Sequence, residues 1–67
     1  MTVNELLCVI DEQENIYISD YEKPIDQMSV YSGFAGKLKE RSESIGSMRV
    51  VNISYSYDAL LILATSR

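Results

Sequence analysis

The sequence predicts a small α+β domain whose elements follow the order αββαββ. Two segments have apolar residues at the spacing of a helix packed on one side, and four have the alternating or β-branched pattern of strands. A chain of 67 residues has room for one small core. We therefore expect a single domain over residues 1–67, with a four-stranded antiparallel or mixed sheet and two helices packed on one face.

The first helix is expected over residues 2–11. Thr2 and Glu5 have the spacing of a capping box, in which the side chain of each residue binds the backbone amide of the other. The apolar residues behind this cap recur at helical spacing and predict one buried stripe. Cys8 lies off that stripe, which places its thiol at the flank of the helix. The stripe consists of Val3, Leu6, Leu7 and Ile10.

A hairpin of two strands is expected next, at residues 15–21 and 27–32, because polar and apolar residues alternate in both segments. Pro24 lies between them. Since proline cannot donate a ladder hydrogen bond, the connection is predicted to be a turn. The side chains expected to face the helices are Ile16, Ile18, Met28 and Val30.

The second helix is expected over residues 33–43, followed by strands at residues 48–55 and 58–65 and a bend at residues 56–58. The run at residues 60–64 is apolar at every position, which favours a central strand or one that is covered on both faces. In the second helix the expected inward side chains are Phe34, Ala35 and Leu38, and the expected solvated ones are Lys37, Lys39 and Glu40.

The residue types of catalytic and metal sites are largely missing. The chain has no histidine, which is the commonest general base and metal ligand, and its one cysteine cannot form a zinc site. Gly33, Gly36 and Lys37 do not have the spacing of a phosphate-binding loop, and residues 11–15 lack the glycine and final glutamate of a calcium loop. We therefore predict no enzymatic activity, no cofactor and no metal.

The compartment is predicted from cysteine usage and from the apolar runs. A single cysteine excludes an internal disulfide, which is typical of a protein from a reducing compartment. The first residues lack the basic start of a signal peptide, and no apolar run approaches the roughly 20 residues of a membrane span. These features predict a cytoplasmic protein without a membrane segment.

Acidic charge is concentrated in one segment of this chain, whose formal net charge is −4. Because phosphate backbones are bound by concentrated basic surfaces, we do not expect direct nucleic-acid binding. Three interpretations of the segment follow: it meets a basic partner, it takes part in head-to-tail contact between copies of the chain, or it imitates phosphates in the binding site of an enzyme. Its acidic residues are Asp11, Glu12, Glu14, Asp20, Glu22 and Asp26, and Lys23 is the one opposing charge among them.

A group of tyrosines and serines alternates with the inward side chains of the first two strands. Tyrosine offers a large contact area at a small entropic cost, and serine adapts its hydrogen bonds. We interpret these residues as a partner-binding face, although the β-propensity of tyrosine explains their presence equally well. Stacking of RNA bases on such a face is a second interpretation, which the acidic surroundings disfavour. The predicted contact residues are Tyr17, Tyr21, Tyr31, Ser19 and Ser29.

Several segments resemble one class of short proteins. They are Thr2-Val3-Asn4-Glu5-Leu6-Leu7, Ile16-Tyr17-Ile18, Tyr31-Ser32-Gly33 running into Leu38, Val50-Val51-Asn52-Ile53 and Leu61-Ile62-Leu63. They are similar to accessory proteins of bacteriophages and conjugative elements of Gram-positive bacteria, and the likeness covers most of the chain. The resemblance implies a mobile-element origin and a role in engaging host or element proteins. By the same analogy, small acidic phage proteins that inhibit host nucleases such as CRISPR effectors imply an inhibitory alternative.

The leading prediction is therefore a non-catalytic module that binds a host or element protein through its tyrosine-rich face. One alternative is an acidic inhibitor of a nucleic-acid enzyme, which imitates phosphates. Another is a self-associating structural protein, a homo-oligomer, because the run at residues 60–64 is apolar on both sides.

Overall fold

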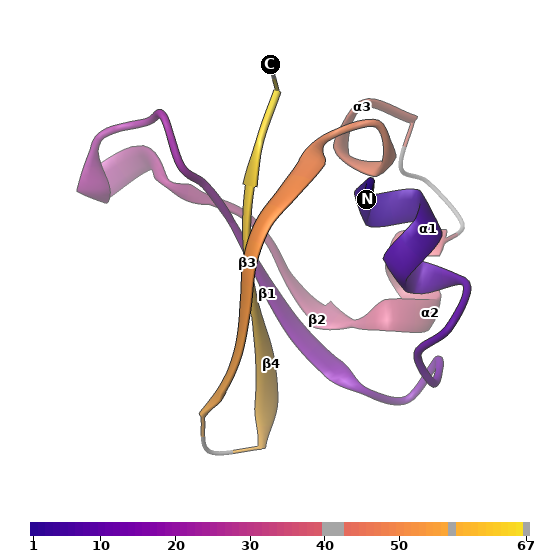
Figure 1. Ribbon diagram of the computed structural model, residues 1–67. Coiled ribbons are helices and arrows are strands. Elements are labelled where there is room, and N and C mark those ends of the chain that lie inside the picture. The colour runs from indigo at the N-terminus through magenta and orange to yellow at the C-terminus, as the bar shows by residue number, and fades with distance from the viewer. Residues whose placement is uncertain (40–42, 57, 67) are drawn as a thin grey trace.

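The computed structural model describes residues 1–39, 43–56 and 58–66, which form a layer of short helices on one face of a sheet (Figure 1). The elements are α1 (Val3–Leu7), β1 (Asn15–Asp20), the 3-10 helix η1 (Ile25–Gln27), β2 (Ser29–Phe34), α2 (Ala35–Lys39), α3 (Glu43–Gly46), β3 (Arg49–Ser56) and β4 (Ala59–Thr65). The four strands pair in the order β2-β1-β4-β3, with β1 and β4 parallel at the centre and an antiparallel pair on each side. The predicted α+β class and the order αββαββ are confirmed, and the sheet is mixed.

Helix α1 begins at the predicted capping box. The backbone amide of Glu5 donates to Thr2 Oγ1 at 3.2 Å, and the backbone amide of Thr2 donates to Glu5 Oε1 at 2.8 Å. These two bonds satisfy amides that the first helical turn leaves without a partner. The stripe behind the cap is buried at Val3, Leu6 and Leu7, so the predicted core face of this helix is confirmed.

The helix is shorter than its predicted range of residues 2–11, because the chain turns after Leu7. The backbone amide of Gln13 donates to Asp11 Oδ1 at 2.8 Å, a local bond that competes with helical hydrogen bonding. Cys8 is exposed at the end of the helix, as predicted.

The core lies between the helices and one face of the sheet. Ile16 and Ile18 of β1 and Ile62 of β4 are buried in one cluster with Ala35 and Leu38 of α2. Strand β4 lies between β1 and β3, so its predicted central position is confirmed. Since a central strand contacts neighbours on both sides, an apolar residue at nearly every position of β4 suits its place in the sheet.

The hairpin of β1 and β2 contains a bulge that alternation in the sequence does not reveal. Ile18 lies opposite Tyr31, whereas Ser19 lies opposite Ser29, so Val30 is an additional residue in β2. Because side chains alternate between the two faces of a strand, one additional residue changes which of the later side chains face the core.

Tyr31 therefore belongs to the core, and the prediction that it points away from the helices is wrong. Its side chain is 7% exposed, and its hydroxyl donates to the backbone carbonyl of Phe34 at 2.6 Å. Of the two side chains of β2 and its approach that were expected to face inward, Val30 is half-buried and packs against the core, and Met28 is half-buried.

The predicted second helix is divided into α2 and α3. Gly33 still belongs to β2, where its φ of 142° suits glycine, and a Cβ atom there would lie 3.2 Å from the hydroxyl oxygen of Tyr31. Phe34 is 52% exposed, so its predicted inward orientation is wrong; Ala35 takes the inward position where α2 begins. For the rest of this segment, Ala35 and Leu38 are buried and Lys37 and Lys39 are exposed as predicted, while Glu40 lies outside the described residues.

Residues 1–3 pair with the beginning of β3 on the side opposite β4. The amide of Val3 donates to the carbonyl of Met48 at 2.9 Å, and the amide of Val50 donates to the carbonyl of Met1 at 2.8 Å. Thr2 and Arg49 form an antiparallel bridge between these bonds. The outer edge of β3 thus already accepts one short antiparallel segment. At its other end β3 leads into the predicted bend at residues 56–58, of which Tyr57 lies outside the described residues.

The core position of Tyr31 predicts that the variant Tyr31→Phe is less stable than the wild type by about 1–2 kcal/mol, because the carbonyl of Phe34 loses its donor. Urea denaturation monitored by circular dichroism measures this difference. The matched change Tyr17→Phe, at a half-exposed residue, should alter the unfolding free energy by less than about 0.5 kcal/mol. Equal effects at the two positions would contradict the assignment of Tyr31 to the core.

The capping box predicts an acid-dependent loss of stability. The hydrogen bond from the Thr2 amide, helped by the Thr2 hydroxyl and the N-terminal charge, holds the pKa of Glu5 below its usual value of 4.5. A carboxyl group whose pKa is lowered by folding stabilises the fold above its unfolded pKa, and this contribution is lost as the pH falls through the folded pKa. We expect the unfolding free energy to fall more steeply below pH 4.5 in the wild type than in Glu5→Gln. Urea titrations between about pH 3 and 6 test this, and parallel curves would refute it.

Candidate interaction surface

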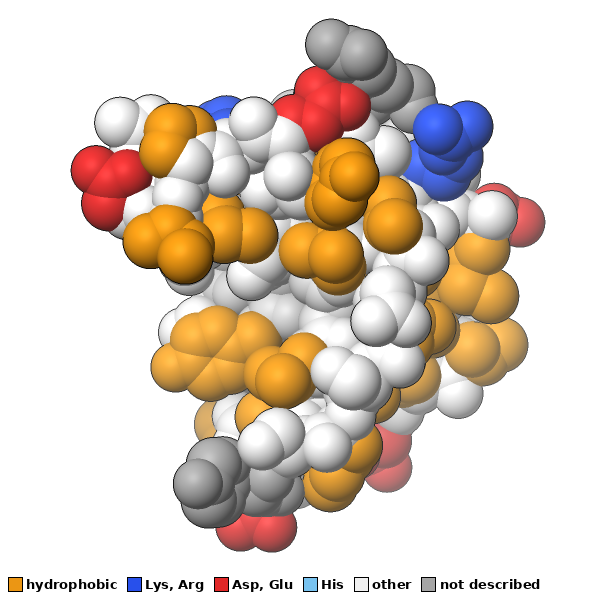
Figure 2. Space-filling view, turned by 60° about the vertical axis from the view of Figure 1, so that its left-hand side comes forward, with side chains coloured by type: hydrophobic (Ala, Val, Ile, Leu, Met, Phe, Trp, Pro, Cys, Tyr) orange, Lys and Arg blue, Asp and Glu red, His pale blue; other side chains and the backbone are white. Residues whose placement is uncertain are grey.

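One face of the sheet has no described α-helix packed on it. In Figure 1 the α-helices α1, α2 and α3 lie to the right of the sheet and the turn that contains η1 projects to the upper left, and Figure 2 brings the left-hand side forward. There, hydrophobic side chains are separated by polar side chains and backbone, and the surface between them is hollowed. We call this surface the open face. Its hollow measures about 300 Å³ and is lined by Tyr17, Ser19, Asn52, Ser54, Leu61, Ile62 and Leu63.

The pairing of the strands arranges the side chains of the open face in rows, two of which contain residues around the hollow. Residues directly opposite each other in neighbouring strands share a face of the sheet. The registers of the three strand pairs therefore extend each row across the whole sheet, from β2 through β1 and β4 to β3. One row is Ser32, Tyr17, Leu61 and Ser54; the other is Ser29, Ser19, Leu63 and Asn52.

The two rows are uncharged and contain both apolar and polar side chains. Tyr17 is 50% exposed, and Leu61 and Leu63 are half-buried although no described helix covers them. Serine and asparagine side chains surround these apolar groups and offer hydrogen bonds to a ligand or to water. A surface of this composition can bind a partner by contact.

The structure brings together only part of the predicted contact group. Tyr17, Ser19 and Ser29 lie on the open face. Tyr31 is in the core because of the bulge, and Tyr21 follows the end of β1, where it is 59% exposed but does not line the hollow. The residues that sequence reasoning missed are Leu61, Leu63, Asn52, Ser54 and Ser32. The signal for the two leucines was present, because residues 60–64 are apolar on both faces of their strand.

The predicted acidic patch does not form one surface. Asp20 is 5% exposed, and its Oδ1 accepts from the backbone amide of Glu22 at 3.0 Å. Glu22 Oε1 accepts from the hydroxyl of Thr65 at 2.9 Å. Asp11, Glu12 and Glu14 precede β1, whereas Glu22 and Asp26 follow it, and a strand of this length separates the two groups by roughly 20 Å. The prediction of a continuous acidic patch is therefore wrong, because β1 carries its two ends to opposite sides of the molecule.

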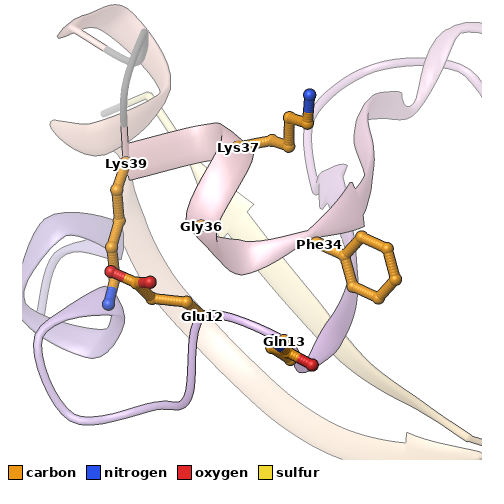
Figure 3. Close-up of a pocket in the computed structure, with 6 residues that line it drawn as sticks. All are labelled: Glu12, Gln13, Phe34, Gly36, Lys37 and Lys39. Atoms are coloured by element: carbon orange, nitrogen blue, oxygen red, sulfur yellow. The ribbon is translucent and has the colours of Figure 1, made fainter.

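A second depression, of about 480 Å³, lies between the loop before β1 and helix α2 (Figure 3). The amide of Gly36 donates to the carbonyl of Glu12 at 2.8 Å and holds the two walls together. In Figure 3, Phe34 and Lys39 lie on opposite sides of the view, and the side chain of Lys37 points away from Lys39. Because the side chains of the depression do not converge on one point, its geometry favours no particular ligand. Its lining residues are Glu12, Gln13, Phe34, Gly36, Lys37 and Lys39.

Tyr55 marks an acidic region at the end of β3. It is 62% exposed, on the side of the sheet that carries the helices, since it lies opposite Leu60 and thus in line with the core residue Ile16. The negative charge of Glu14 raises the pKa of the Tyr55 phenol above its usual value of 10.0, and partial desolvation and the charge of Asp58 act in the same direction. Two carboxylates therefore lie near the far end of this strand.

Within residues 1–39, 43–56 and 58–66, no three Cys, Asp or Glu side chains gather closely enough to hold a metal ion. No helix in this part of the chain is both long enough and apolar enough to cross a membrane. No family model matches the chain, and no curated protein or solved structure matches it at a significant level.

The proximity of Tyr55 to Glu14 predicts that Glu14→Gln lowers the pKa of Tyr55 toward its usual value of 10.0. The phenol carbon resonances of the tyrosines, followed by NMR between about pH 8 and 12, measure each pKa separately. Glu12→Gln is the matched control, because Glu12 precedes β1 as Glu14 does but does not act on Tyr55. If the pKa of Tyr55 is the same in Glu14→Gln as in the wild type, the predicted proximity of Glu14 and Tyr55 is wrong.

Proposed function

We propose that this chain is a non-catalytic protein-interaction module that binds a protein partner through the open face. The observation that supports the proposal most is the pair of uncharged rows, in which Tyr17, Leu61 and Leu63 are surrounded by serine and asparagine side chains. Aromatic and aliphatic groups at the centre of a surface, with polar groups around them, are the composition of protein–protein interfaces.

The size of the molecule is compatible with such an interface. A stable protein–protein contact buries about 800 Å² on each partner, which is about a sixth of the 4630 Å² accessible surface of this chain. The molecule measures 28 × 26 × 18 Å, so one broad face has about this extent. Leu61 and Leu63 are already half-buried and would lose their remaining contact with water when a partner covers the hollow.

The partner's chemistry follows from the absence of charge in the two rows. A neutral, partly apolar surface is complemented by a neutral, partly apolar surface, and binding between two such surfaces depends little on salt. We place the partner among the cytoplasmic proteins of a bacterial host or mobile element, because the chain resembles accessory proteins of phages and conjugative elements. Imitation of phosphates has less support, since Asp20 is buried and the other acidic side chains lie at both ends of β1.

Substitution of a single tyrosine tests the proposal. The immobilised chain is incubated with a lysate of its native host, the retained protein is purified, and its dissociation constant is measured by calorimetry. We expect Tyr17→Ala to weaken binding at least about tenfold, the effect of removing a central aromatic contact. Tyr21→Ala is the matched control, because Tyr21 is similarly exposed but lies outside the hollow, and it should bind within about twofold of the wild type.

Circular dichroism confirms that both variants are folded before binding is compared. If Tyr17→Ala binds as tightly as Tyr21→Ala, the open face is not the contact surface. The salt dependence separates the two mechanisms: the affinity for the partner should change little between about 0.05 and 0.5 M salt, whereas phosphate imitation requires a steep loss.

A further inference from the structure

We propose that two copies of this chain associate through the outer edges of their β3 strands, which pair antiparallel and join the two sheets into one sheet of eight strands. The occupant of this edge is a second copy of the same chain. The proposal concerns the edge of the sheet, so it stands independently of what the open face binds.

The outer edge of β3 is free along most of its length. β3 is the last strand of the sheet, and residues 1–3 cover it only at residues 48–50. In the part of the chain that the structure describes, no strand pairs with the outer side of residues 51–56. An edge of this kind presents unpaired N–H and C=O groups at every second residue, which another strand can bind.

The opposite edge of the sheet is less suited to this pairing. Strand β2 contains the bulge at Val30 and the left-handed φ of Gly33, and it leads directly into α2. Bulges and an early end are features by which edge strands resist pairing with another chain. Strand β3 has a bulge of its own at Val51, next to the segment that residues 1–3 cover. Beyond that bulge residues 52–56 keep an unbroken register with β4, so the edge of β3 offers the longer regular stretch of backbone.

The side chains of β3 also lack the usual protection of an edge. No charged residue or proline occurs between Val50 and Ser56. Val51, Ile53 and Tyr55 are 48%, 41% and 62% exposed. Exposed apolar side chains on an uncharged edge strand favour pairing with another strand, because that pairing removes them from water and satisfies the backbone groups.

The charges at the two ends of β3 favour an identical, antiparallel partner. Arg49 begins the strand, while Asp58 and Glu14 lie near Tyr55 at its far end. When two such strands run antiparallel, the basic beginning of each comes near the acidic end of the other. The antiparallel pair thus has two equivalent sites at which Arg49 of one copy comes near the carboxylates of the other, in a chain whose net charge is −4. A parallel pair would bring Arg49 near Arg49 and the carboxylates near each other.

Symmetry limits the register of the pair. A two-fold axis perpendicular to the sheet keeps each face on its own side, so opposed residues must be an even number of positions apart. The axis then passes midway between the two copies of one residue, which lie opposite each other. The middle of the free segment is Ile53 or Ser54. With the axis at Ser54, Ile53 lies opposite Tyr55 of the second copy; with the axis at Ile53, the two Ile53 side chains lie opposite each other. Either register covers exposed apolar side chains.

Sedimentation equilibrium of the full chain at about 1–200 μM tests the proposal. The expected species is a dimer of twice 7.6 kDa, and Ile53→Lys, which sets a charge in the pair, should raise its dissociation constant at least about tenfold. Val9→Lys is the control, because Val9 is a 76% exposed apolar residue at the end of α1, and it should leave the dimer unchanged. A wild-type chain that remains monomeric over this range overturns the proposal, as does an unchanged dimer in Ile53→Lys.

A charge-reversal cycle tests whether the two β3 strands pair antiparallel. It also replaces the first test if Ile53→Lys does not fold. Arg49→Asp and Asp58→Arg should each weaken the dimer about threefold or more, and the double variant should recover to within about twofold of the wild type. Both residues are exposed, so these changes leave the core untouched. Single reversals without effect, or a double variant no better than the single ones, would exclude the antiparallel β3 pair.

Discussion

The parallel pairing of β1 with β4 is the contact on which the rest of the structure depends. Each half of the chain contributes one antiparallel hairpin, and this pairing is the contact that joins the two hairpins into one sheet. It aligns Ile18 with Ile62 beneath the helices and, on the reverse side, Tyr17 with Leu61. One set of backbone hydrogen bonds thus positions the core and the open face together, so that neither can shift without the other.

The described α-helices are short and cover only one face of the sheet. The helices α1, α2 and α3 contain five, five and four residues, and all of them lie on the same side of the sheet. The described residues therefore bury one face of the sheet and leave the other in contact with water. The open face meets this condition by placing Leu61 and Leu63 between polar neighbours, which leaves a partly apolar surface at modest cost in solubility.

Local patterns in the sequence predicted the parts of the fold that depend on local interactions. The capping box of Thr2 and Glu5 and the central position of the apolar strand required only neighbouring residues. The bulge that turns Tyr31 inward depends on the pairing of two separate strands, and alternation along one strand carries no information about it. Tyr17 was assigned correctly to the face away from the helices because β1 is regular, whereas Leu61 and Leu63 of the open face were missed because they come from a strand far along the chain. Asp20 was assigned to the surface because charge suggests exposure, but an amide two residues later binds its carboxylate in the turn.

The open face points in a direction perpendicular to that in which the edge of β3 would pair, so the two proposed contacts can form at the same time. Neither proposal depends on the other. Pairing at the edge leaves the side chains of both faces accessible, so a dimer would present two open faces on the same side of one continuous sheet. A partner with two equivalent sites, or two partners in one assembly, would then meet a bivalent surface. Since a second contact on a joined surface forms at a high effective concentration, a modest affinity at each small face would give much tighter binding overall. For a molecule with one short sheet, doubling that sheet is the direct way to enlarge its contact area without lengthening the chain.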